Sequence, residues 1–110
     1  MILVLCRSAL FFETLASMAP DEEFRRSPEG DLALFARELE RAKPELAIYE
    51  ASYFIDPAPY RLASAATRFV VAGDPGDERR TDEALRYGAV AALQKPLVPG
   101  ETLAVLALAR

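Results

Sequence analysis

Short apolar runs alternate with stretches of helical periodicity along the whole chain. Three runs, Ile2–Cys6, Leu46–Tyr49 and Phe69–Ala72, lack the alternation of polar and apolar residues that a half-exposed strand shows. Such runs are typical of strands covered on both faces, as in a parallel sheet. Two further strands are predicted at Glu23–Ser27, whose charges favour the edge of a sheet, and at Ala89–Leu93.

Helices are predicted after the strands. They span Ser8–Met18, Pro28–Ala42, Asp77–Tyr87 and Pro99–Arg110, and a short one spans Tyr60–Ala66. Ser8 and Asp77 are expected to act as N-caps, because a short polar side chain can bond the free N–H groups of a first turn. Gly88 is expected to end its helix in a left-handed conformation. The residues expected to face inward from the last helix are Leu103, Leu106 and Ala107.

Strands that are each followed by a helix indicate a parallel sheet with right-handed crossovers and helices on both faces. The chain has 110 residues, of which 52% are hydrophobic, so residues 1–110 are expected to form a single domain around one sheet. The predicted class is therefore α/β, with a doubly wound five-stranded parallel sheet in three layers.

The charge and the residue types exclude several classes of function. The net charge is -4, and no basic cluster exceeds the pairs Arg25–Arg26 and Arg79–Arg80, so direct binding of nucleic acid is not expected. The chain has no histidine and one cysteine, which removes His-dependent triads, His-ligated zinc and an intrachain disulfide. No segment resembles a membrane span or a signal peptide, so we expect a cytoplasmic protein.

In an open parallel sheet, functional groups gather beyond the carboxyl ends of the strands. The residues that the predicted strands place there are Cys6, Arg7, Ser8, Glu50, Ala51, Ala72, Gly73, Asp74 and Lys95. We interpret Cys6 as a small apolar residue at a strand end. The loop Gly73–Asp77 has the composition of a tight turn followed by a helix cap.

Two stretches of sequence resemble the receiver domain of two-component response regulators. One is Gly30–Leu34 followed by Lys43–Glu50, and the other is Tyr87–Ala89 followed by Leu93–Leu97. The resemblance runs over essentially the whole chain in the same order. It implies a sheet in the order 2-1-3-4-5, the flavodoxin-like receiver fold.

The resemblance also implies a function. Receiver domains take a phosphoryl group onto an aspartate at the end of the third strand, beside a magnesium ion held by an acidic pair after the first strand. A Thr or Ser after the fourth strand and an aromatic residue on the fifth relay the change, and a lysine in a Lys-Pro pair contacts the phosphate.

Most of these residues are replaced in this chain. The acidic pair falls on Cys6 and Arg7, the aspartate on Glu50, the Thr or Ser on Ala72, and the aromatic residue on Ala92, while Lys95 is kept. A cation at the mouth of the site would repel a metal ion, so we expect no metal, no cofactor and no catalysis. The expected function is an atypical receiver-like signalling module that binds proteins and is not phosphorylated in the usual way.

Two alternatives stay open at the site. Asp56 would be the acceptor if a strand ran from Leu46 through Ile55, which is long for a strand. Glu50, reaching toward Lys95 and Arg7, either imitates a permanently active state or is simply neutralised by neighbouring cations.

The expected partner is another protein or a second copy of the chain, as in a homodimer. Tyr87, Leu97 and Val98 lie near the fourth helix and the fifth strand, the face through which receivers usually dimerise or touch effectors, and they are the candidate interaction face. The alternative function is a working phosphoacceptor, or a small-ligand-binding domain of the flavodoxin-like fold.

Overall fold

The structure, a computed structural model, describes residues 1–27, 32–53 and 67–110. Its strands are β1 (Ile2–Leu5), β2 (Phe24–Arg26), β3 (Leu46–Glu50), β4 (Arg68–Gly73) and β5 (Ala91–Gln94). Its helices are α1 (Ala9–Met18), α2 (Leu32–Ala42), α4 (Glu78–Arg86) and α5 (Pro99–Ala109), and a 3-10 turn, η2, spans Ala51–Tyr53. No helix among the described residues is both long and apolar enough to cross a membrane.

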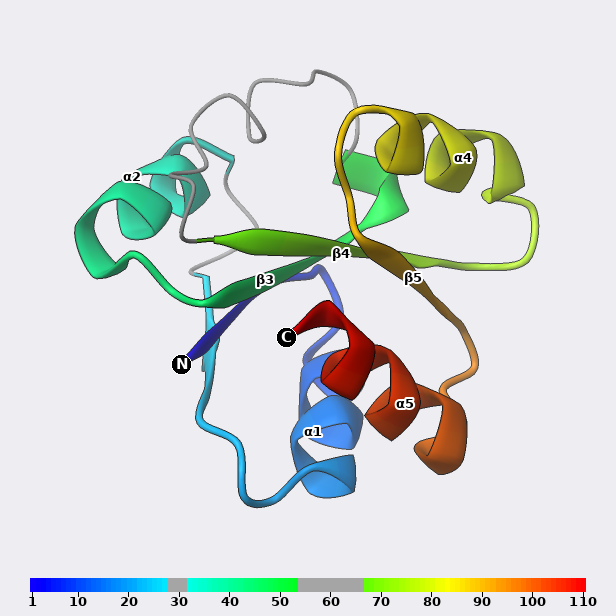
Figure 1. Cartoon of the computed structure of the whole chain (residues 1–110), viewed down its shortest axis with the longest axis horizontal. Coiled ribbons are helices and arrows are strands. Elements are labelled where there is room, and N and C mark those ends of the chain that lie inside the picture. The colour runs from blue at the N-terminus through cyan, green and yellow to red at the C-terminus, as the bar shows by residue number, and fades with distance from the viewer. Residues whose placement is uncertain (28–31, 54–66) are drawn as a thin grey trace.

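The strands form one parallel sheet in the order β2-β1-β3-β4-β5, as the sequence predicts. Helices α1 and α5 cover one face, and α2 and α4 cover the other (Figure 1). Alternate residues of β1 point to opposite faces, so Ile2 and Val4 pack with α1 and α5 while Leu3 and Leu5 pack with α2 and α4. Because both faces are covered, the central strands can be apolar throughout.

The edges of the sheet are formed by β2 and β5. Strand β2 has three residues, and Arg25 at its centre is exposed, which confirms the expected charged edge. Strand β5 begins at Ala91, two residues later than predicted. Ala89 instead caps the end of α4: its N–H donates to the carbonyl of Ala84 after the chain has turned at Gly88 (φ 120°).

The two predicted N-caps behave differently. The hydroxyl of Ser8 accepts a hydrogen bond from the N–H of Phe11 at 3.2 Å, so this cap is confirmed. Asp77 occupies the N-cap position of α4 but makes no side-chain bond to that helix. Its carboxylate instead accepts from the N–H of Asp74 at 3.1 Å, because the tight turn before the helix brings that donor closer.

Helix α5 presents a different face to the core from the one predicted. Its buried residues are Thr102, Leu106 and Ala109, whereas Leu103 is 47% exposed and Ala107 is also exposed. The expectation for Leu106 is confirmed, and those for the other two are wrong. The helix carries apolar residues on all sides, so its pattern of hydropathy does not single out the buried stripe.

Some predictions fall outside the described residues. These are the start of the second helix at Pro28–Asp31, the short helix at Tyr60–Ala66, and Asp56 as an acceptor. The long strand that the Asp56 alternative requires is not present, because β3 ends at Glu50 and η2 follows directly.

We expect Ser8→Ala to lower the free energy of unfolding by about 1 kcal/mol, because the N–H of Phe11 loses its acceptor in the first turn of α1. Ser17→Ala is the matched control, since Ser17 lies exposed near the other end of the same helix and bonds only the carbonyl of Thr14. Urea unfolding of both variants measures the difference. Equal stabilities would contradict the capping role.

Candidate functional site

Glu50 lies at the carboxyl end of β3, in the middle of the sheet. Its side chain is 9% exposed, and both of its carboxylate oxygens are engaged. Oε1 accepts a hydrogen bond from the main-chain N–H of Arg7, and Oε2 forms an ion pair with the ammonium group of Lys95. The carboxylate is therefore held between the end of β1 and the end of β5.

Lys95 follows β5 directly and is held by several groups at once. Its N–H donates to the carbonyl of Gly73 at 2.9 Å, which extends the pairing with β4 by one bond. Its ammonium also lies 3.6 Å from Asp74 Oδ2 and 4.7 Å from the centre of the Phe11 ring. Because the side chain is only 13% exposed, the charge of Lys95 interacts with groups inside the protein and little with solvent.

Arg7 contributes to the site in a way that the sequence does not reveal. Its guanidinium lies over the ring of Tyr53, 5.0 Å from the ring centre, and forms no ion pair with Glu50. The expected pairing between the two side chains is therefore wrong. The turn η2 places Tyr53 beside Arg7, and the flat guanidinium stacks on the aromatic face.

A second arginine, Arg26, lies beside the carboxyl end of β1, and the sequence does not predict it as a site residue. Its guanidinium donates to the carbonyl of Cys6 at 3.2 Å and to the carbonyl of Arg7 at 3.1 Å. The pairing of β2 with β1 brings it there. The signal for it was the predicted order of the sheet, which places the end of the second strand next to the end of the first.

Cys6 is buried at the end of β1, and its thiol contacts the carbonyl of Ser8 at 3.4 Å. Burial raises the pKa of this thiol above its usual value, although the nearby Arg26 guanidinium acts in the opposite direction. The sulfur therefore stays a neutral thiol, in line with the interpretation of Cys6 as a packing residue.

Alanines occupy the two positions to which the resemblance assigns a Thr or Ser and an aromatic residue. Ala72 is 1% exposed in β4, paired in register with Glu50. Ala92 is partly buried and lines a small cleft of about 80 Å³ between β5 and α5. A methyl group brings no hydrogen bond to either place.

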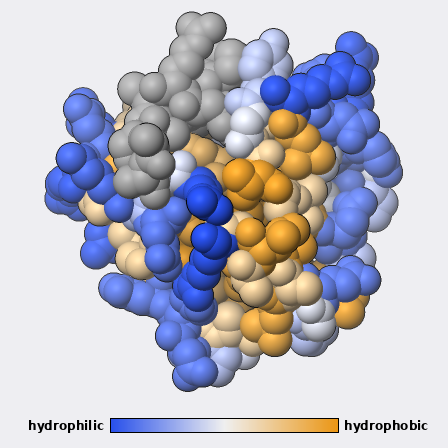
Figure 2. All heavy atoms as spheres, in the orientation of Figure 1, coloured by the Kyte–Doolittle hydropathy of each residue, from blue (hydrophilic) through white to orange (hydrophobic). Residues whose placement is uncertain are grey.

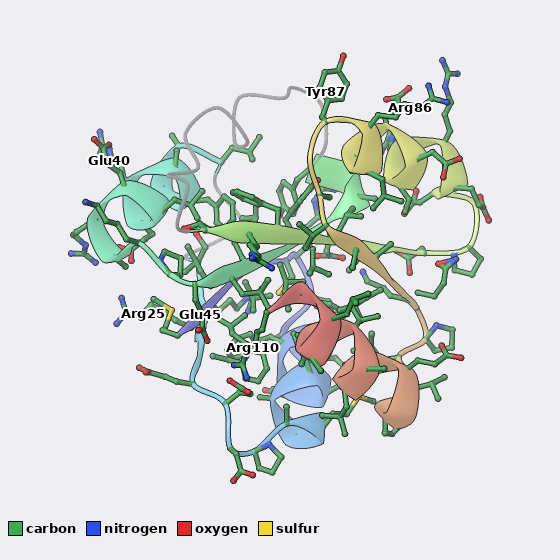
Figure 3. All side chains as sticks on the ribbon, viewed as in Figure 1. Arg25, Glu40, Glu45, Arg86, Tyr87 and Arg110 are labelled. Carbon is green, nitrogen blue, oxygen red and sulfur yellow. The ribbon has the colours of Figure 1, made fainter. Side chains whose placement is uncertain are left out.

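The three residues of the predicted interaction face do not lie together. Tyr87 is 57% exposed just after α4, where it precedes β5 and points away from the sheet (Figure 3). Val98 is 48% exposed and follows β5, at the other end of that strand. Leu97 is partly buried against the core. All three residues therefore flank the edge strand β5, but Tyr87 precedes this strand whereas Leu97 and Val98 follow it.

A hollow of about 420 Å³ opens between α1 and the β5–α5 connection. We call it the α1 hollow, and it is lined by Ser8, Leu10, Phe11, Thr14, Glu50, Asp74, Lys95, Pro96 and Leu97. Its wall combines apolar side chains with the charged groups of the site. The sequence places Asp74 at this edge of the sheet but does not identify Leu10 or Phe11 as site residues, because which helix turn faces a strand end depends on packing.

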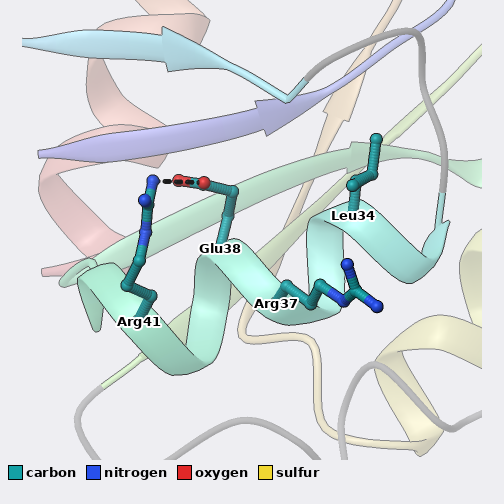
Figure 4. A pocket seen from close by; sticks show the side chains of 4 residues that line it. All are labelled: Leu34, Arg37, Glu38 and Arg41. Carbon is teal, nitrogen blue, oxygen red and sulfur yellow. Dashed lines mark hydrogen bonds and ion pairs between the residues drawn. The ribbon is translucent and has the colours of Figure 1, made fainter.

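A smaller hollow of about 200 Å³ lies on the outer face of α2, lined by Leu34, Arg37, Glu38 and Arg41 (Figure 4). Glu38 pairs with Arg41 on its own helix and with Arg25 on β2. This carboxylate therefore links α2 to the edge of the sheet and partly neutralises both guanidinium groups.

The site does not fit the magnesium ion that the resemblance implies. Magnesium binds carboxylates and water oxygens in an octahedral arrangement. Among the described residues, no three acidic, histidine or cysteine side chains are grouped so that they could hold a metal ion. The two carboxylates nearest the site, Glu50 and Asp74, both face the ammonium of Lys95, and Cys6 presents a neutral thiol.

Solved structures share this architecture. NtrX from Brucella abortus superimposes with a TM-score of 0.82 at 19% identity, covering 98% of this chain and 25% of that one. FixJ from B. japonicum gives 0.77 at 18% identity, covering 97% and 56%. The signal receiver domain of a LuxO repressor protein from Vibrio parahaemolyticus gives 0.80 at 18% identity, covering 97% and 86%.

The chain has the receiver fold. No protein-family model matches it, and no curated protein matches its sequence. The chain spans about a quarter of the NtrX chain and just over half of FixJ. At identities below one fifth, these matches establish the receiver fold and leave the function to the residues of the site.

We expect Lys95→Met to lower the free energy of unfolding by about 3–5 kcal/mol, because it leaves the buried carboxylate of Glu50 without its cation. The double variant Glu50→Leu with Lys95→Met should recover most of this loss. Arg110→Met is the control, since the pairs of Arg110 with Glu22 and Glu45 are more exposed and should contribute about 1 kcal/mol or less. A single Lys95 variant as stable as the unsubstituted protein would refute the buried pair.

We expect iodoacetamide to alkylate Cys6 at least ~tenfold more slowly in the folded protein than in urea at neutral pH. The reagent attacks the thiolate, and burial both raises the pKa of the thiol and covers the sulfur. Mass spectrometry over time gives the two rates. Equal rates would show a reactive thiolate at this strand end.

Proposed function

We propose that this chain is a receiver-like signalling module that acts by binding protein and takes up no phosphoryl group at the usual position. The observation that carries the proposal is the double engagement of Glu50, whose two oxygens are used by the Arg7 N–H and the Lys95 ammonium. An acceptor carboxylate must turn an oxygen toward the phosphoryl donor, and here each oxygen is already bonded to a donor within the protein.

The charge balance supports the same proposal. Phosphoryl transfer relies on a metal ion to neutralise the developing charge. Here Lys95 is the internal cation of the site, and the guanidinium of Arg26 lies at the carbonyls of the strand where the resemblance implies acidic metal ligands. The Arg26 guanidinium in that place repels a metal ion, while the ammonium of Lys95 stabilises the Glu50 carboxylate directly.

The surface supports binding to protein. Helix α5 has one charged residue, Glu101, and its outward side carries Leu103 and Leu108, which are 47% and 74% exposed. Figure 2 shows hydrophobic side chains gathered over β5 and α5, with hydrophilic residues on both sides of them. An apolar surface of this kind is typical of an interaction site.

We expect no covalent uptake when the protein is incubated with magnesium and acetyl phosphate, because Glu50 is buried and both of its oxygens are occupied. Intact mass spectrometry detects one added phosphoryl group. Amide spectra recorded with magnesium and beryllofluoride should likewise show no saturable shifts at Glu50 and Lys95.

A phosphoryl adduct, or saturable shifts with beryllofluoride, would overturn the proposal and favour a working phosphoacceptor. Peptide mapping of the adduct would then distinguish Glu50 from Asp56. The variant Lys95→Met with Glu50→Leu serves as a control, because it removes the carboxylate at the end of β3: an adduct at Glu50 would disappear in this variant, whereas an adduct at Asp56 would persist.

A further inference from the structure

The carboxyl end of α4 presents a cation between two exposed apolar side chains. We call Leu85–Tyr87 the α4 tip. Leu85 is 40% exposed and Tyr87 is 57% exposed, and Arg86 between them is exposed and forms no ion pair with a described residue. Figure 3 shows Tyr87 and Arg86 both pointing away from the sheet. The tip therefore combines a positive charge with apolar area at one end of the molecule.

The α1 hollow has the opposite character. Its cation, Lys95, is already paired with Glu50, whereas the side chain of Asp74 is 61% exposed and touches Lys95 only at 3.6 Å. Leu10 is 72% exposed at the hollow, and Leu97 lies on its wall. A carboxylate beside apolar side chains suits a ligand that is both cationic and apolar.

The helices that flank the hollow reinforce this character. The charged residue of α1 is Glu13, and the charged residue of α5 is Glu101, so neither helix carries a basic side chain. Among the exposed residues that line the hollow, Asp74 is the charged one and it is negative, while Ser8, Leu10 and Pro96 are uncharged. A cationic side chain entering from outside meets no repulsion from either helix.

We propose that the α4 tip of one copy docks into the α1 hollow of a second copy. Arg86 then pairs with Asp74 of the partner subunit, while Leu85 and Tyr87 pack on apolar side chains at the hollow. The hollow, at about 420 Å³, is large enough to admit one of these side chains. The proposal rests on the proposed function and names its partner as the chain itself.

The position of the two surfaces determines the kind of assembly. The α4 tip precedes β5 and the hollow lies beyond its other end, so one copy can offer its tip while its own hollow is filled. Such a contact is head-to-tail, and it builds open chains or rings in place of two-fold dimers. Tyr87 and Leu97, which lie apart in one copy, then belong to the two halves of one contact.

Sedimentation equilibrium over a hundredfold range of concentration tests the self-association. We expect a reversible increase in mass that continues beyond the dimer at high concentration, because each open chain of copies ends in one tip and one hollow that can bind a further copy. A contact between three residues and one hollow belongs to the small, weak class of protein interfaces, so the increase in mass should occur at about micromolar to millimolar protein. A strict monomer over this range would overturn the proposal.

Two variants identify the surfaces. Arg86→Ala removes the charge of the tip, and Asp74→Lys reverses that of the hollow, and each should weaken association about tenfold or more. Arg80→Ala is the matched control, because Arg80 is an exposed arginine on the same helix away from the tip. Association that persists in both variants would show that other surfaces carry it.

Mixing the two variants gives the sharpest result. The Asp74→Lys protein keeps an intact tip, and the Arg86→Ala protein keeps an intact hollow, so an equimolar mixture should form a one-to-one dimer that grows no further. This rescue also excludes misfolding of either variant. A mixture that stays monomeric would overturn the proposal. The phosphoryl test above is independent, so failure here leaves its outcome unchanged.

Discussion

The ion pair between Glu50 and Lys95 connects the parts of the molecule on which the site depends. It joins the end of the central strand β3 to the connection after β5, while the other oxygen of Glu50 bonds the chain just after β1. Because the pair is almost fully buried, each charge is stabilised only while the other is present. The three strand ends are therefore held together by electrostatic contacts with one carboxylate.

Much of the fold could be predicted because its signals are local. Uninterrupted apolar runs such as Leu46–Tyr49 have few alternatives to a strand covered on both faces, and they became the centre of the sheet. A single hydroxyl at Ser8 fixed the start of α1. The position of Glu50 at a strand end, and of Lys95 after the last strand, followed from the same pattern.

What the sequence could not provide was the direction of individual side chains. Arg7 stacks on Tyr53 because a turn places that ring within reach, and nothing in the residues nearby indicates this. In α5 Thr102 is buried and Leu103 is exposed, because packing geometry decides which side of a helix faces the core when every side is apolar. The carboxylate of Asp77 likewise accepts from the N–H of Asp74 and not from a donor in the first turn of α4.

The brevity of β2 has a consequence for the behaviour of the folded chain at high concentration. An open sheet edge invites a strand from another molecule, and such additions lead to aggregates. Here one edge is three residues long and carries the exposed Arg25, whose charge and bulk oppose an incoming strand. The sheet is thus protected at this edge against the addition of a strand from an unfolded copy.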